Sequence, residues 1–214
     1  MINNFITLIN EKYPLTEINC GEFVKMNVKG VKFSISAYKA KGLGHVSVMR
    51  GSCMMGLMKM DTLIINPTNL DLPLYSYDRI FALGNDTLIV ELYDTLLSEY
   101  DEAKMQSIKA KYADLPERDP GQHWYDSIKL ASSISKKGKK KQSERLGDLA
   151  TWHFETYLKS SKTPVTDKEA KQKKARVYVN GLIEKGGPST DVFKGAIGEE
   201  KTRILFENIL FGTK

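Results

Sequence analysis

Apolar and polar residues alternate along the first half of the chain with the period of two that is typical of β-strands. Short turn sequences interrupt this alternation at Lys29–Gly30, Lys41–Gly44 and Gly84–Asp86. Connections this short join antiparallel neighbours, so the pattern predicts a meandering antiparallel sheet. The predicted strands are Glu22–Val28, Val31–Tyr38, His45–Arg50, Cys53–Ile65, Leu74–Leu83 and Thr87–Tyr93.

From Asp94 onward the apolar residues recur with a helical period instead. The N-terminal Met1–Lys12 is also expected to form a short amphipathic helix. Strands followed by helices predict an α+β domain in which helices cover an antiparallel sheet, and a single domain over residues 1–214 is the simplest expectation. The predicted later helices are Leu96–Tyr112, Trp124–Ile134, Glu144–Leu158, Lys168–Ile183 and Thr190–Leu210.

The composition narrows the class of protein. Hydrophobic residues make up 41% of the 214 residues and charged residues 27%, with a mean hydropathy of -0.35, as in soluble globular proteins. No apolar run is long enough to cross a bilayer. The N-terminal segment lacks the basic opening and the continuous apolar stretch of a secretory signal. We therefore expect a cytoplasmic protein that does not associate with membranes.

Charge and cysteine content bear on partners and cofactors. The chain has 32 Lys and Arg against 26 Asp and Glu, a net charge of +6, which favours an acidic partner through long-range attraction. Nucleic acid, an anionic membrane surface and an acidic electron-transfer protein all fit that description. Cys20 and Cys53 show no CxxC spacing and have no neighbouring histidines, which argues against an iron–sulfur or structural zinc site.

One carboxylate, that of Asp78, is placed where it could take part in proton transfer. In the strand that begins at Leu74, Asp78 shares its face with apolar and small residues, namely Leu74, Ser76, Ile80 and Ala82. If that face is covered, loss of hydration raises the pKa of Asp78, and the group could hold and donate a proton near neutral pH. The alternative is a structural, hydrogen-bonded carboxylate at a strand edge, or a solvated face.

The strand before it is unusually rich in methionine. Polarizable side chains around a glycine could form a floor for a flat conjugated ligand. Ordinary core packing is the alternative for the same residues. The even-numbered face of this run holds Met54, Gly56, Met58, Met60, Thr62 and Ile64.

Other candidate chemistry is sparse. The three histidines, His45, His123 and His153, form no nucleophile motif with a nearby serine or cysteine, and GxSxG, Walker A and GxGxxG segments are absent from the sequence. His153 lies on an apolar helical stripe, where a core histidine is expected. The basic run 135–143 is predicted to be a solvated loop. Aromatic residues do not interleave with it, which disfavours a nucleic-acid interface at Lys136–Lys141.

Two segments resemble the family of ferredoxin-dependent bilin reductases. The first is residues 67–78, PTNLDLPLYSYD, which is similar to the proline-bounded loop that leads into the strand carrying the family's catalytic aspartate. Asp78 falls on that aspartate. The second is residues 191–200, DVFKGAIGEE, followed by Ile209–Phe211, which is similar to the family's closing pattern of a helix, a Gly-Glu step and a final helix.

The resemblance implies an α/β/α sandwich with a central antiparallel sheet and an open-chain tetrapyrrole of the biliverdin type between the sheet and the C-terminal helices. It also implies single electrons from an external ferredoxin or flavodoxin, no metal or flavin of the protein's own, and Asp78 as proton donor to a substrate radical. Basic side chains such as Arg50, Lys59 or Arg79 could pair with substrate propionates. The expected substrate-contact residues are Arg50, Met58, Met60, Thr62, Ile64, Asn66, Ser76 and Asp191.

The sequence also departs from the family pattern. Thr62 stands where some members carry a histidine paired with the aspartate, and Arg50 stands near the position of a further glutamate. Residues 186–188, Gly-Gly-Pro, occupy the region of another family aspartate, which leaves Asp191 as the nearby carboxylate. An alternative function is therefore a non-catalytic tetrapyrrole or haem carrier, with His45 or His153 as a possible axial ligand.

Overall fold

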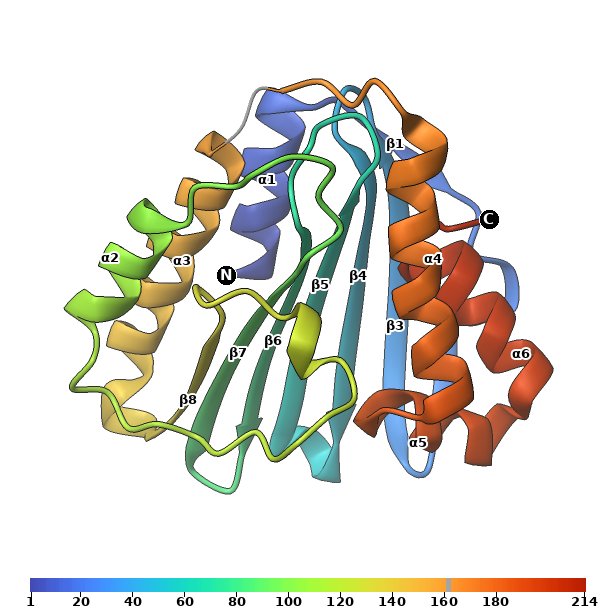
Figure 1. Ribbon diagram of the computed structural model, residues 1–214. Helices are drawn as coiled ribbons and strands as arrows, with labels where there is room; N and C mark the ends of the chain where they lie inside the picture. Colours follow the sequence, from blue (N-terminus) through green and yellow to red (C-terminus); the bar gives the residue numbers. More distant parts are fainter. Residues whose placement is uncertain (161–162) are drawn as a thin grey trace.

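The computed structural model describes residues 1–160 and 163–214, apart from the side chain of Met54. Within these residues an eight-stranded antiparallel sheet forms the middle layer, in the order β1-β3-β4-β5-β6-β7-β8 with β2 beside the other half of β3 (Figure 1). The strands are β1 (Leu15–Ile18), β2 (Lys25–Val28), β3 (Val31–Ala40), β4 (Gly44–Cys53), β5 (Met58–Pro67), β6 (Leu74–Ala82), β7 (Asn85–Tyr93) and β8 (Ile134–Lys139).

Helices cover both faces of this sheet (Figure 1). We call the face that packs against α1 and α3 the back face, with α2 lying on α3, and the face that packs against α4, α5 and α6 the front face. This arrangement confirms the predicted α+β class and three-layer sandwich. The helices are α1 (Ile2–Lys12), α2 (Ala103–Lys111), α3 (Ser143–Lys159), α4 (Lys168–Lys185), α5 (Pro188–Ile197) and α6 (Glu199–Ile204), followed by a π-helical turn at Leu205–Leu210.

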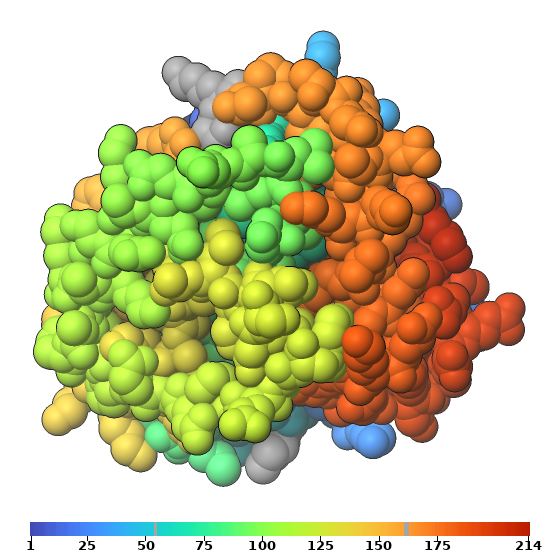
Figure 2. Space-filling model, in the orientation of Figure 1, coloured from blue at the N-terminus to red at the C-terminus, as the bar shows by residue number. Residues whose placement is uncertain are grey.

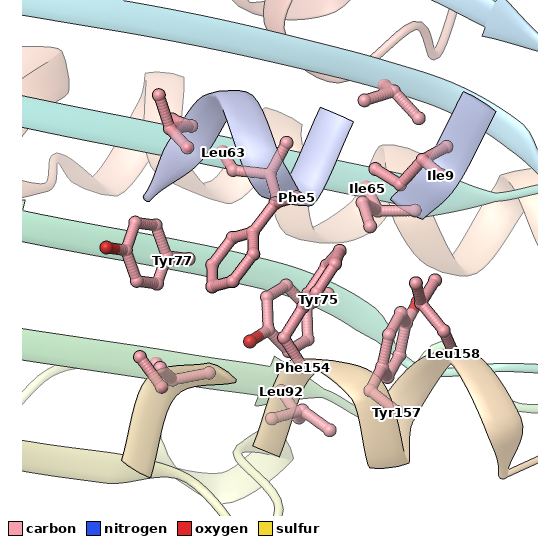
Figure 3. Close-up of a cluster of buried hydrophobic side chains, with 14 of the residues drawn as sticks. Phe5, Ile9, Leu63, Ile65, Tyr75, Tyr77, Leu92, Phe154, Tyr157 and Leu158 are labelled. Atoms are coloured by element: carbon pink, nitrogen blue, oxygen red, sulfur yellow. The ribbon is translucent and has the colours of Figure 1, made fainter. Parts of the chain in front are cut away.

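Aromatic side chains pack the back face (Figure 3). The ring of Phe5 on α1 stacks on Phe154 of α3, with 4.1 Å between centroids, and Tyr75 of β6 lies 4.6 Å from Tyr157 of α3. Tyr75 and Tyr77 are completely buried. Burying each such side chain contributes about 1.5–3 kcal/mol, so this cluster is a main source of the folding free energy.

Local backbone chemistry explains why the predicted hairpins form. Leu83 and Gly84, which join β6 to β7, have φ values of 49° and 75°, as a type I′ turn requires. Gly44 begins β4 where the chain passes very close to β5, since a Cβ at this position would lie 2.3 Å from the carbonyl oxygen of Asn66. Only glycine fits there.

The region between α2 and α3 differs from prediction. The expected helix Trp124–Ile134 is wrong, because only Asp126–Ile128 forms a short 3₁₀ turn. Backbone groups of this region pair with the end of β7 instead: Leu130 N–H donates to the Leu92 carbonyl and Asp94 N–H donates to the Ile128 carbonyl. Tertiary pairing outweighs the local helical pattern.

The basic run 135–143 is not a solvated loop. Its first half lies in β8, which pairs with β7, and its second half is a 3₁₀ turn that leads into α3. Lys136 is only 1% exposed. Its ammonium donates to the Leu115 carbonyl at 2.9 Å and to Glu117 Oε1 at 2.6 Å, so the charge is satisfied inside the protein.

Further elements also differ from prediction. The predicted helix Thr190–Leu210 breaks at Gly198, whose φ of 83° ends α5 and begins α6. The first strand, β1, was not predicted. Among the described residues, no helix combines the length and the hydrophobicity needed to span a membrane.

Candidate functional site

A cavity of about 230 Å³ lies on the front face, between the sheet and the elements that cover it. The sheet supplies its floor, and the walls come from α4, the start of α5 and the C-terminal turn. The remaining side is closed by residues 112–133, which we call the covering segment. Figure 2 shows this yellow-green segment across the centre of the front face, beside α4 and α5. The floor residues from β5 and β6 are Met60, Thr62, Ile64, Ser76, Asp78 and Ile80.

Asp78 is the central acid of this cavity. Thr62 is its register partner on β5, so the two side chains meet, and the Thr62 hydroxyl donates to Asp78 Oδ1 at 2.5 Å. Burial raises the pKa of Asp78 to about 6, opposed by this hydrogen bond and by Arg118 and reinforced by the negative charge of Glu91. A carboxyl group with that pKa is partly protonated near neutral pH and is therefore able to donate a proton.

Glu91 places a second carboxylate on the same wall. Its register partner is Ser76, which puts Glu91 diagonally across from Asp78 on the neighbouring strand. The hydroxyl of Tyr93 donates to Glu91 Oε2 at 2.6 Å, and Lys129 Nζ lies 3.7 Å from Glu91 Oε1. These partners place a hydroxyl donor and a cation against the Glu91 carboxylate beside Asp78.

The covering segment brings a cation and an imidazole to the opposite wall. Arg118 lines the cavity and donates to Ser135 Oγ at 3.3 Å. His123 also lines it, stacked on Tyr125 with 4.9 Å between ring centroids. Among the described residues its buried Nδ1 has no hydrogen-bond partner, and Asp126 Oδ1 lies 3.9 Å away. The cavity therefore brings carboxylate, guanidinium and imidazole groups together with the apolar side chains of its floor.

Aromatic and aliphatic side chains complete the enclosure. The ring of Tyr178 on α4 lies 4.2 Å from that of Tyr93 on β7, and Phe206 and Phe211 close the C-terminal side. Thr190 contributes from the first turn of α5. Mostly apolar and aromatic walls with a few polar groups are typical of small-molecule binding sites.

The structure brings together five of the sequence-predicted site residues. Met60, Thr62, Ile64, Ser76 and Asp78 all line the cavity. They do so because they occupy alternating positions on two neighbouring strands, the arrangement that the period of two indicated.

The other four do not line it. Asn66 is on the same face of β5, but its amide donates to the Phe211 carbonyl at 2.8 Å and anchors the C-terminus. Met58 lies beyond the end of the cavity. Asp191 is exposed on α5, with its carboxylate beside Gly186. Arg50 faces the back of the sheet, where it donates to Asn3 Oδ1 at 2.5 Å. The position of Met54 on the methionine-rich face lies outside the described residues.

The proposed propionate partners and haem ligands also point elsewhere. Lys59 and Arg79 share the back face with Arg50, and Arg79 is buried in an ion pair with Asp86. His45 Nε2 lies 2.7 Å from the Ile209 carbonyl, and His153 is completely buried 3.0 Å from the Ser132 carbonyl.

Sequence reasoning missed Glu91, Arg118 and His123. Glu91 carried a usable signal, since the odd positions of β7 fall on the face of Asp78 once the hairpin register is known. Arg118 and His123 carried none, because they stand in an irregular segment. Within the part of the chain that is described, no group of three or more His, Cys, Asp or Glu side chains could hold a metal ion.

Comparison with known proteins adds a structural likeness. No protein-family model matches this sequence, and no curated protein does. Tomato phytochromobilin synthase, solved in complex with biliverdin, matches the structure with a TM-score of 0.76 at 14% sequence identity. The match covers 99% of this chain and 82% of that chain. The two proteins share a fold.

Proposed function

We propose that this protein reduces a linear tetrapyrrole of the biliverdin type, using single electrons from ferredoxin or flavodoxin and a proton from Asp78. The observation that carries the proposal is the acid on the cavity floor: burial gives Asp78 a pKa of about 6. The acid sits in a fold shared with an enzyme that was solved with biliverdin. The sequence resemblance to bilin reductases points to the same residue.

The proposed chemistry adds two electrons and two protons across one double bond. Each electron comes from one reduced donor protein, which is thereby oxidised. Asp78 gives one proton to the one-electron-reduced substrate, and solvent supplies the second proton and reprotonates Asp78. Thr62 positions the Asp78 carboxyl through its hydrogen bond, and Glu91 favours its protonated form. Arg118 is the cavity cation able to pair with a substrate propionate.

The size of the cavity requires one structural adjustment. Its volume of about 230 Å³ is below the roughly 300–1,000 Å³ of pockets that enclose ligands of drug size, and a bilin is at least that large. The covering segment has little regular secondary structure, with one short 3₁₀ turn at Asp126–Ile128. We expect this segment to move outward when substrate binds, while the sheet floor stays in place.

An anaerobic assay tests the proposal. Purified protein is mixed with biliverdin and a reduced ferredoxin system, and the absorbance of the tetrapyrrole is followed over time. Loss of the biliverdin band in the wild type, and a much slower loss in Asp78→Asn, is expected. Tight binding of biliverdin or haem without donor-dependent reduction would instead favour a carrier, and no binding of either would reject the tetrapyrrole site.

A further inference from the structure

The back of the sheet carries a basic area that the proposed chemistry does not use. Four cations lie there on adjacent strands, and all four side chains are exposed; we call them the basic face. They are Lys25 on β2, Lys32 on β3, Arg50 on β4 and Lys59 on β5. They line a shallow groove of about 640 Å³, and among the described residues that line it Asp61 is the acidic one.

The strand register places these cations on one face. Ser34 is opposite both Lys25 and Arg50, and Ser52 is opposite both Lys32 and Lys59. Directly paired residues point to the same side of a sheet, so the four charges form one field. Among residues 1–160 and 163–214, none of the four forms a salt bridge with a carboxylate. The field is therefore available to an outside partner.

The helices leave this part of the sheet open. Helix α1 spans only the upper part of the sheet, and its N-terminus lies near mid-height (Figure 1). Arg50 marks the border, since it donates to Asn3 in the first turn of α1. Three large apolar side chains are exposed where β5 begins and β6 ends: Leu57 at 63%, Phe81 at 38% and Leu83 at 78%, and Phe81 is the register partner of Lys59. An apolar patch with charged neighbours is typical of a protein interface.

This surface lies directly behind the cavity. Met49, the chain neighbour of Arg50, lines the cavity, and so does Met60, the neighbour of Lys59. Because successive residues of a strand point to opposite faces, a partner on the basic face is separated from the cavity floor by one sheet layer. The covering segment closes the opposite side of the cavity. A partner bound to the basic face therefore does not obstruct the side from which we expect substrate to enter.

We propose that the basic face docks a small acidic one-electron carrier protein of the ferredoxin or flavodoxin class, which delivers its electrons through the sheet to the ligand in the cavity. The charges are complementary, and the position keeps the donor outside the cavity. This inference rests on the proposed function. Reduction of one double bond then requires two successive docking events, each of which oxidises one carrier.

A triple charge reversal tests the docking site. Lys25→Glu, Lys32→Glu and Lys59→Glu are combined, while Arg50 is kept because it contacts Asn3. With an acidic [2Fe–2S] ferredoxin as donor at low ionic strength, we expect the KM for ferredoxin to rise by about tenfold or more, because complementary charges govern association. The biliverdin affinity, and the reduction rate with a small chemical reductant, should equal those of the wild type.

The matched control reverses three other exposed lysines: Lys104→Glu and Lys111→Glu on α2, with Lys168→Glu on α4. It changes the net charge equally and should leave the KM for ferredoxin within about twofold, because exposed charges more than a Debye length from the interface are largely screened. Equal losses in both triples, or no loss in the first, would overturn the docking site. So would anionic-vesicle or RNA binding that depends on the three lysines while the KM for ferredoxin stays unchanged. Absence of reduction with either donor in the wild type would reject the proposed function itself.

Discussion

Asp78 and Arg79 are neighbours on β6, yet they belong to different environments. Arg79 faces the back layer, where Asp86 accepts two hydrogen bonds from it at 3.1 and 2.7 Å and the Ser143 carbonyl accepts a third at 2.6 Å. Asp78 faces the front cavity, and its one side-chain partner among the described residues is Thr62. The back of the sheet satisfies its buried charge, whereas the front leaves an acid available for reaction.

The same difference extends over the two faces. Tyr75 and Tyr77 are enclosed on the back face, where close-packed rings provide stability. Ser76, Asp78 and Ile80 alternate with them and remain partly accessible from the cavity. Stability and chemistry can therefore be altered separately by substituting neighbouring residues of one strand.

The largest expected effect is on catalysis. Asp78→Asn keeps the shape of the side chain and removes the acid, so we expect the rate of biliverdin reduction to fall by roughly 10²–10⁴-fold, the usual contribution of a general acid. Stopped-flow absorbance under anaerobic conditions measures this rate. Stability should be unchanged or greater at neutral pH, because a buried acid has been removed.

Asp148→Asn is the matched control for that substitution. Asp148 is exposed on α3, which packs on the back of the sheet. The same chemical change should leave the rate within about twofold, since a surface substitution away from the site has little effect. A wild-type rate in Asp78→Asn, or equal losses in both variants, would remove the distinction between the faces.

The back face should show the opposite behaviour. Asp86→Asn leaves the buried Arg79 without its ionic partner, which typically costs about 3–5 kcal/mol of unfolding free energy. Urea denaturation followed by circular dichroism measures this loss. At a temperature where the variant is folded, its reduction rate should remain close to that of the wild type. Full stability together with lost activity would contradict the assignment of Arg79 and Asp86 to a structural role.

These contrasts show how far sequence reasoning reaches. The alternation through residues 22–93 could predict the sheet, because its hairpins are local and each strand pairs with the next. It could also predict that Thr62, Ser76 and Asp78 share a surface. The packing of Lys136 against Glu117 could not be foreseen from a run of lysines, because that contact depends on how β8 joins the sheet.

The missed part of the site has the same physical origin. Arg118 and His123 reach the cavity from a segment whose path is set by long-range pairing with β7 and by contacts such as that of the Trp124 indole N–H with the Gly186 carbonyl at 3.0 Å. No periodic pattern encodes such a path. Arg50 was assigned to the cavity wrongly although its strand was predicted correctly. Successive residues of a strand point to opposite faces, and Met49 lines the cavity, so Arg50 points to the back of the sheet.

Proton linkage should also differ between the faces. Asp78 has a raised folded pKa of about 6 against an ordinary 3.8, so its stabilising effect is complete below pH 3.8 and is lost as the pH rises to about 6. Burial lowers the pKa of His153, on the back, from 6.5 to about 4, so its effect is present above pH 6.5 and is lost as the pH falls to about 4. In the wild type, the two groups therefore change the unfolding free energy with pH in opposite directions.

Asp78→Asn should therefore expose the contribution of His153. Between pH 4 and pH 6 the unfolding free energy of the variant should rise with pH, by up to about 3 kcal/mol, while that of the wild type should change much less. Chemical denaturation across this range measures both. Parallel pH curves for the two proteins would show that Asp78 does not titrate with a raised pKa.

The smallest expected effect concerns Glu91, whose charge raises the pKa of Asp78. Glu91→Gln removes that charge while keeping an oxygen that can accept the hydrogen bond of Tyr93. We expect the pKa of Asp78 to fall by roughly half a unit to one unit, which moves the alkaline limb of the pH profile of kcat/KM to lower pH by the same amount. Glu184→Gln, an equal charge change at an exposed position of α4, should leave that limb in place. If the limb stays fixed in both variants, Glu91 does not act on Asp78. If it moves in both, the effect comes from net charge and not from the pairing of two carboxylates across neighbouring strands.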